Sequence, residues 1–198
     1  MNFSMFKATV AAAALSIGAA HAAGASYVLD ASFAFPDGGD YGTVDLTQDG
    51  GNVDVDVQLS PGFKFVKTGN HDAFTFNIGG ATSYSVTNVD SNRYGWIQSA
   101  SNPALGSFTD GLVCSTCHNG NVGAFASDLT FTVTDVTLAD FTKNRAGYSF
   151  SADIIGEGVT GAVGARDPET IPVIPEPASC TLMLVALASM GLAARRRQ

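Results

Sequence analysis

Polar and apolar residues alternate with a period of two along much of the middle of this chain. The run NVDVDVQL at 52–59 places valine or leucine at every second position, and DLTFTVT at 128–134 alternates in the same way. Because successive side chains of a strand point to opposite faces of its sheet, each run predicts a strand with one buried face. Further strand-like runs are found at 27–35, 42–48, 63–66, 73–78, 84–89, 93–97 and 148–154.

Short glycine-rich segments separate the predicted strands, among them PDGGD, QDGG and IGG. Glycine and Asp-Gly pairs allow the positive φ that tight hairpin turns require. Since no stretch between the two ends has an apolar period of 3.6 residues, the pattern predicts an all-β fold. We expect an antiparallel β-sandwich over 23–160, with a jelly roll as one possible strand order, and then a linker over 161–174 that is rich in glycine and proline.

The N-terminal residues 1–22 have the pattern of an export signal. Lys7 precedes an apolar, alanine-rich stretch, and Ala20-His21-Ala22 has the small-x-small form of a cleavage site. This arrangement is typical of a secretory signal helix that signal peptidase removes, here after Ala22. We therefore expect the following domain to fold outside the cytoplasm.

The C-terminal residues 175–198 combine a rigid triplet, an apolar segment and a cluster of positive charge. The uncharged stretch at 180–194 is close to the roughly 17 residues that the shortest bilayer-spanning helices require. We expect a single transmembrane helix here, followed by a membrane stop on the cytoplasmic side that consists of Arg195, Arg196 and Arg197. The preceding triplet, Pro175-Glu176-Pro177, is expected to stay extended because proline fixes φ and lacks an N–H donor.

Taken together, these three parts resemble the PEP-CTERM sorting signal of Gram-negative bacteria. The resemblance covers about 25 of the 198 residues. It implies that a membrane-embedded exosortase recognises Pro175, Glu176 and Pro177, cleaves near them and releases or transfers the protein. It also implies transient anchoring in the inner membrane, followed by transfer to the cell surface or to the exopolysaccharide of a biofilm matrix.

The domain that remains after both ends are removed is strongly acidic. Residues 23–175 contain 17 acidic and 6 basic residues, which gives a net charge near −11. Such a charge disfavours nucleic acids and anionic membrane surfaces as partners. Extracellular polysaccharide and other surface proteins remain as candidates, so the leading hypothesis is a structural or binding protein without catalytic activity.

The segment CSTCH at 114–118 is the sharpest candidate for chemistry in the domain. C-x-x-C-H is the attachment signature of c-type haem, in which Cys114 and Cys117 would bind the vinyl groups and His118 the iron. His71 is the remaining candidate for a second axial ligand, and the same four residues could hold zinc. Two cysteines three positions apart in an oxidising compartment more simply form a local disulfide, which is the favoured interpretation. An exported haem protein is therefore an alternative hypothesis.

No G-x-S-x-G, P-loop or H-E-x-x-H motif is present, which leaves a cryptic extracellular hydrolase as a second alternative. Neighbouring His71 and Asp72 would point to opposite faces of a strand, so the segment GNHD is interpreted as a turn. Four aspartates could supply calcium ligands without EF-hand spacing, although solvated turns and strand faces explain them as well: Asp37, Asp40, Asp54 and Asp56. We expect no cofactor.

Overall fold

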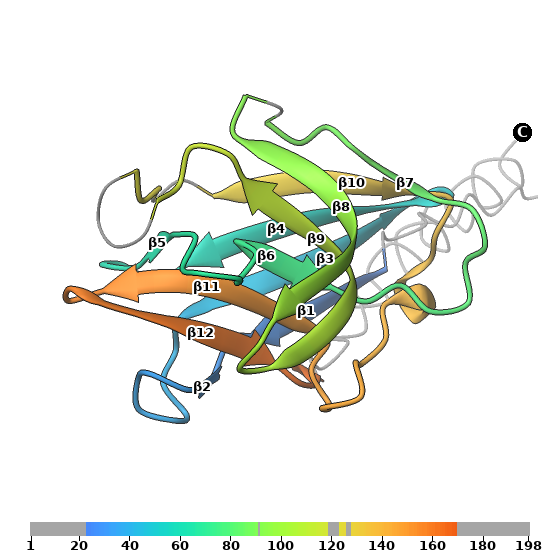
Figure 1. The fold of residues 1–198 in the computed structure, drawn as a ribbon. Coiled ribbons are helices and arrows are strands. Elements are labelled where there is room, and N and C mark those ends of the chain that lie inside the picture. Colours follow the sequence, from blue (N-terminus) through green and yellow to red (C-terminus); the bar gives the residue numbers. More distant parts are fainter. Residues whose placement is uncertain (1–22, 91, 119–122, 126–127, 170–198) are drawn as a thin grey trace, which may run out of the picture.

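The computed structural model describes residues 23–90, 92–118, 123–125 and 128–169. Over these residues the chain forms thirteen β-strands and one 3-10 helix, η1 (Leu138–Asp140), so the predicted all-β fold is confirmed (Figure 1). The strands are β1 (Gly24–Val28), β2 (Ala31–Ser32), β3 (Gly42–Asp49), β4 (Asn52–Leu59), β5 (Lys64–Phe65), β6 (Phe74–Phe76), β7 (Ser85–Thr87), β8 (Tyr94–Asn102), β9 (Gly106–Cys114), β10 (Leu129–Thr134), β11 (Phe150–Gly156), β12 (Val159–Ala165) and β13 (Pro168–Glu169).

The strands pair antiparallel in two sheets. The first sheet has the order β13-β1-β3-β4-β10-β7, and the second has the order β2-β12-β11-β6-β9-β8, with β5 beside β11. The consecutive strands β3–β4, β8–β9 and β11–β12 pair as hairpins, each within one sheet. In a jelly roll most successive strands lie in opposite sheets, whereas these three successive pairs each share a sheet here, so the jelly-roll order is wrong for this domain.

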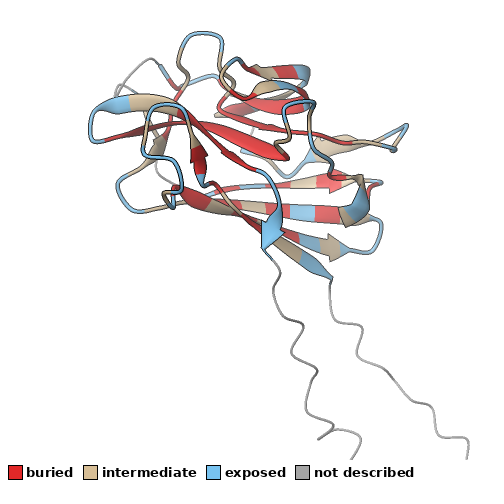
Figure 2. Ribbon diagram, turned by 90° about the horizontal axis from the view of Figure 1, so that it is seen from below, coloured by how far each residue is buried: buried red, intermediate tan, exposed pale blue. Residues whose placement is uncertain are grey.

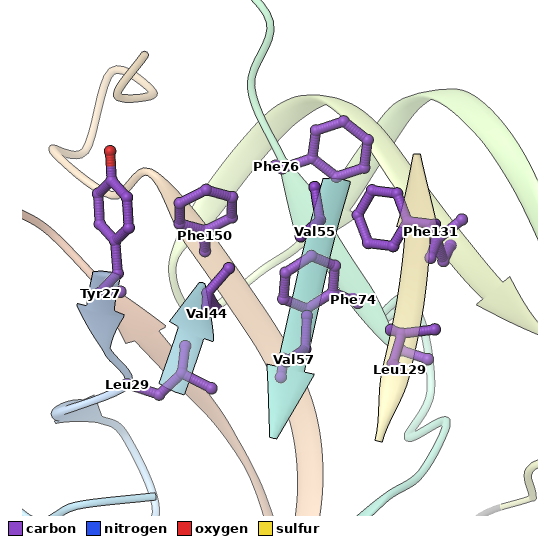
Figure 3. Close-up of a cluster of buried hydrophobic side chains, with 14 of the residues drawn as sticks. Tyr27, Leu29, Val44, Val55, Val57, Phe74, Phe76, Leu129, Phe131 and Phe150 are labelled. Carbon is purple, nitrogen blue, oxygen red and sulfur yellow. The ribbon is translucent and has the colours of Figure 1, made fainter. Parts of the chain in front are cut away.

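The main hydrophobic core lies between the two sheets (Figure 3). The first sheet contributes the alternate apolar residues that the sequence predicted, such as Val55 and Val57 of β4. The second sheet contributes large aromatic side chains, among them Phe74, Phe76 and Phe150, each fully buried. Burial of such side chains removes the most apolar surface per residue from water, so these residues contribute strongly to the stability of the fold.

The β8–β9 hairpin bends at its middle and covers part of the outer face of the second sheet. Ser99 has φ +64°, a left-handed conformation that is uncommon outside glycine. The pairing register skips Ser99 and Thr109, and the Thr109 N–H donates to Asn77 Oδ1 at 3.0 Å. Beyond the bend, the hairpin and β12 form a second buried cluster that consists of Ala100, Leu105, Phe108 and Ala162.

The folded domain continues further toward the C-terminus than the sequence predicted. β12 covers all of 161–165, and β13 pairs with β1 through Glu169 and Ser26. The assignment of 161–169 to a linker is therefore wrong. The glycines that suggested a linker are packing positions, since a Cβ on Gly161 or Gly164 would lie 2.3 or 2.9 Å from a neighbouring side-chain atom.

Both ends of the folded domain lie at one edge of the first sheet, where β1 and β13 are paired (Figure 2). Buried and exposed residues alternate along the strands of this sheet, as the same view shows. Within the part of the chain that the structure describes, no helix is long and apolar enough to cross a membrane. The predicted signal helix at 1–22 and the predicted transmembrane helix within 175–198 lie outside the described residues.

Candidate functional site

A groove of about 350 Å³ lies across β3, β4 and β10 on the outer face of the first sheet. Strand alternation places polar side chains there, because the apolar residues of the same strands point into the core. The volume falls within the range of about 300–1,000 Å³ that is usual for small-molecule sites. The polar lining consists of Asp45, Thr47, Asp54, Asp56, Asn88, Thr130 and Thr132.

A chain of hydrogen bonds connects three side chains that line the groove. Asn88 Nδ2 donates to Thr132 Oγ1 at 3.1 Å, and Thr132 Oγ1 donates to Asp54 Oδ1 at 2.7 Å. Asn88 has φ +57°, a conformation that asparagine tolerates better than most residues. Consecutive hydrogen bonds polarise one another, so these three side chains hold one another in place at the groove.

Two carboxylates that line the groove face each other across neighbouring strands. Asp45 of β3 and Asp56 of β4 occupy directly opposite positions in the antiparallel register. Like charges in such positions destabilise a sheet. Gln58 Nε2 donates to Asp56 Oδ2 at 2.9 Å, whereas Asp56 Oδ1 has no hydrogen-bond partner among the described residues. The pair therefore weakens the fold, and the unpartnered Asp56 Oδ1 is itself buried from solvent.

The groove is suited to ligands that donate hydrogen bonds. No lysine, arginine or histidine occurs in the described strands of the first sheet. Carboxylate oxygens accept strong, charge-assisted hydrogen bonds from hydroxyl and ammonium groups. Over the described residues, no group of three or more His, Cys, Asp or Glu side chains could hold a metal ion. The aspartates considered for calcium, Asp37, Asp40, Asp54 and Asp56, are therefore not gathered into one site.

A second groove, of about 450 Å³, lies where the β8–β9 hairpin bends. Several polar groups that line this second groove already form hydrogen bonds within the fold. Asn144 Oδ1 accepts from two backbone N–H groups and its Nδ2 donates to the Leu105 carbonyl, while Thr109 Oγ1 accepts from the Ile78 N–H. These bonds hold the bent hairpin in place, so the groove on the first sheet is the stronger candidate for a ligand site.

Cys114 and Cys117 form a disulfide at the end of β9, with their Cα atoms 5.3 Å apart. Both residues are at most 3% exposed and belong to the main hydrophobic core. The Cys117 N–H donates to Cys114 Sγ at 3.0 Å. The structure therefore contains the local disulfide that the sequence favoured.

The residues considered for haem or zinc do not form one cluster. His118 is exposed beside the buried disulfide, and His71 faces Asp153 of β11. No combination of Cys114, Cys117, His118 and His71 gives a metal-binding group within the described ranges. Haem or a metal ion at these residues stays a prediction to which this geometry adds no support.

One buried carboxylate, that of Asp153, organises the loop that contains GNHD. The Thr68 N–H donates to Asp153 Oδ2, and His71 Nδ1 lies 3.7 Å from Asp153 Oδ1. The backbone N–H of His71 donates to the Thr68 carbonyl at 3.0 Å, which closes a turn where Gly69 has φ +60°. Sequence reasoning found the turn but missed Asp153, because Thr68 and Asp153 are 85 positions apart and only sheet pairing brings them together.

Asp153 predicts a pH dependence of stability. Burial raises the pKa of its carboxyl from 3.8 to about 6, against the lowering effects of Thr68 and His71. A group whose pKa is higher in the folded than in the unfolded protein stabilises the fold at pH values below its unfolded-state pKa. This stabilisation is lost as the pH rises through its folded-state pKa. From pH 4 to pH 7, the free energy of unfolding should fall by on the order of 3 kcal/mol relative to Asp153→Asn. Urea unfolding at a series of pH values measures this difference.

The matched control is Asp37→Asn, which removes an exposed carboxylate from a loop. It should change the free energy of unfolding by less than about 0.5 kcal/mol, as is usual for substitutions at exposed positions away from the core. Parallel profiles for Asp153→Asn and the wild type would contradict the prediction.

Comparison with known proteins provides evidence about the end of the chain. A family model described as the PEP-CTERM protein-sorting motif matches residues 173–197. The tail is a PEP-CTERM sorting motif. The match includes the triplet Pro175-Glu176-Pro177 and the arginines at 195–197, all outside the described residues, and it confirms the resemblance seen in the sequence. The PEP-CTERM motif marks the chain as an exported, exosortase-targeted protein that is sorted to the cell surface.

Three residues lie between the end of β13 and the start of the matched PEP-CTERM segment. No curated protein and no solved structure matches the chain. The evidence about the activity of the domain therefore comes from its own residues.

Proposed function

We propose that the mature protein is a non-catalytic surface or matrix protein of a Gram-negative bacterium that binds extracellular polysaccharide through the groove on the first sheet. The tail brings the domain to exosortase at the inner membrane, and exosortase removes the tail there. One observation carries the proposal: carboxylate, hydroxyl and amide side chains from β3, β4 and β10 converge in one groove of a domain that is sorted to the cell surface.

The chemistry of the groove supports a carbohydrate ligand. Sugars present many hydroxyl groups, and each one that donates to a carboxylate forms a charge-assisted bond, roughly twice as strong as a neutral one. Asp45, Asp54 and Asp56 supply such acceptors, and the hydroxyl groups of Thr47 and Thr130 can both donate and accept. The net charge of the domain disfavours polymers rich in acidic sugars. Neutral sugars and amino sugars are the favoured ligands.

The position of the tail is compatible with this role. β13, from which the chain continues to the PEP-CTERM motif, is an edge strand of the same sheet. The six residue steps from Glu169 to Pro175 span at most about 20 Å when fully extended. The uncleaved domain would therefore remain close to the membrane, and cleavage near the triplet would release it toward the matrix.

Asp45→Asn is expected to weaken polysaccharide binding and to stabilise the domain at the same time. Binding to purified extracellular polysaccharide of the producing bacterium should weaken about ten-fold, which corresponds to about 1.4 kcal/mol. Relief of the repulsion between Asp45 and Asp56 should raise the free energy of unfolding by about 0.2–1 kcal/mol. Isothermal titration calorimetry and thermal unfolding of the exported protein measure the two effects.

Asp128→Asn is the matched control, because it makes the same change of charge at an exposed position outside the groove lining. It should leave both affinity and stability close to those of the wild type. Equal weakening by Asp45→Asn and Asp128→Asn would show that only the overall charge matters, and unchanged affinity in Asp45→Asn would rule the groove out.

A further inference from the structure

The edge strands of the two sheets differ greatly in length. The first sheet ends in β13 and β7, and the second ends in β2 and β8. Three of these strands have two or three residues, whereas β8 has nine. Short edge strands protect a sheet from pairing with another chain, because they offer few unpaired backbone groups. β8 lacks this protection.

The second half of β8 is nevertheless covered by the loop that contains Asp72. The Asp72 N–H donates to the Ser101 carbonyl at 3.0 Å, and Asp72 Oδ2 accepts from the Ser101 N–H at 2.8 Å. Ser99, with its left-handed φ, separates this covered half from residues 94–98. Pairing with another chain is therefore confined to residues 94–98.

Alternate residues of 94–98 point their backbone groups away from β9. The Ser115 N–H donates to the Arg93 carbonyl at 2.8 Å, so Arg93 and every second residue after it face β9. Trp96 and Gln98 alternate with these residues along the strand, so their N–H and C=O groups point away from β9, toward the free edge. Among the described residues, no hydrogen bond outside the pairing with β9 occupies these backbone groups.

The composition of this edge is that of a contact surface. The sequence at 94–98, YGWIQ, contains neither a charge nor a proline, the two residue classes that usually block edge pairing. Gly95 and Gln98 are exposed. Two copies of a domain with a net charge near −11 repel each other. An uncharged segment is the place where that repulsion is weakest.

We propose that two copies of this chain form a dimer by antiparallel pairing of residues 96–98 of β8. A two-fold axis at Ile97 pairs Trp96 of each copy with Gln98 of the other, so the same outward groups are satisfied in both copies. Ile97 packs against the second buried cluster within each copy, and at the axis it lies opposite Ile97 of the other copy. Because β2 at the far end of the sheet has two residues, pairing stops at the dimer.

Sedimentation equilibrium of the exported, processed protein tests this proposal, and the wild type is expected to be dimeric. Gln98→Pro removes an outward N–H and leaves the bonds to β9 in place, a position where a strand accepts proline. Its dimer dissociation constant should rise about ten-fold or more, with the fold retained by circular dichroism. A monomeric wild type, or unchanged dimer affinity in folded Gln98→Pro, would overturn the proposal.

A charge-pair experiment keeps the test independent of the proline variant. Ile97→Lys and Ile97→Asp should each be monomeric, because like charges would face each other at the two-fold axis. An equimolar mixture of the two should restore the dimer. Gln58→Lys, a new charge on the first sheet, should dimerise as the wild type does. A mixture that stays monomeric would overturn the pairing at Ile97.

Discussion

A chain with both Glu176→Ala and Pro177→Ala is expected to cross the inner membrane but to keep its C-terminal arginines. The PEP-CTERM motif matches residues 173–197, and its triplet is the part that exosortase is expected to recognise. Loss of the carboxylate and of one rigid φ removes both the charge and the extended shape of that triplet. We expect about a ten-fold or larger fall in processing efficiency. Mass spectrometry of the membrane and secreted fractions measures the state of residues 195–197.

Glu169→Ala is the control for the tail. It removes an exposed carboxylate of β13 that lies seven residues before Glu176. Its processing should equal that of the wild type. Export of the double variant with a normally trimmed C-terminus would contradict the assigned role of the triplet. Retention of both variants would point instead to a general effect of charge near the membrane.

Phe150→Ala is expected to destabilise the domain by about 3–5 kcal/mol. The Phe150 side chain is fully buried in β11 and lies at the centre of an aromatic group. Its ring centroid is 4.8 Å from that of Tyr27 and 6.0 Å from those of Phe74 and Phe141. Truncation would leave a cavity between the sheets, where the close packing on both sides limits collapse. Urea unfolding of the exported protein measures the loss.

Two variants provide the comparison for Phe150→Ala. Phe33→Ala removes the same side chain from a position that is 70% exposed, and it should change stability by less than about 0.5 kcal/mol. Phe150→Leu keeps most of the volume and should cost less than the alanine variant. Similar losses in Phe33→Ala and Phe150→Ala would contradict the view that stability depends on the core between the sheets.

The strands that could be predicted were those whose alternation is visible in a short window. β4 and β10 show it without interruption, and the valines of both strands are buried as expected, together with Leu129 and Phe131 of β10. β9 was missed because Asp110 and Gly111 interrupt its alternation. Asp110 is nevertheless fully buried, since it accepts hydrogen bonds from Tyr84 Oη at 2.7 Å and from Trp96 Nε1 at 2.9 Å. A carboxylate at a core position is tolerated when distant donors satisfy it, and no local pattern reveals such donors.

Residues 161–165 of β12 were assigned to a linker for a related reason. A glycine in such a segment can have two meanings. It can indicate a flexible chain, or it can mark a position where another element packs closely against the backbone. The β8–β9 hairpin packs against Gly164 through Leu105, so a residue without a Cβ is needed there. The composition of a short segment cannot distinguish the two meanings.

The candidate groove was visible in the sequence only as separate residues. Asp54 and Asp56 were recognised as part of a strand face or of a calcium site. Their neighbours in the groove come from other strands, and the register of β3, β4 and β10 decides that Asp45 faces Asp56 and that Thr132 reaches Asp54. The hypothesis of a non-catalytic binding protein depended on the export signal, the acidic strand-rich domain and the sorting tail, and it stays a proposal.

The sequence by itself determined where this protein goes and which class of fold it adopts. The sorting motif is matched as a linear segment, and alternation with a period of two is a property of neighbouring residues. The tertiary structure decided which residues meet: it brings Thr68 to Asp153 and Asp45 to Asp56. It also leaves the outer edge of β8 at 94–98 without a neighbouring strand among the described residues. The physical reason is that backbone geometry is set by local residues, whereas strand pairing joins segments that are distant along the chain.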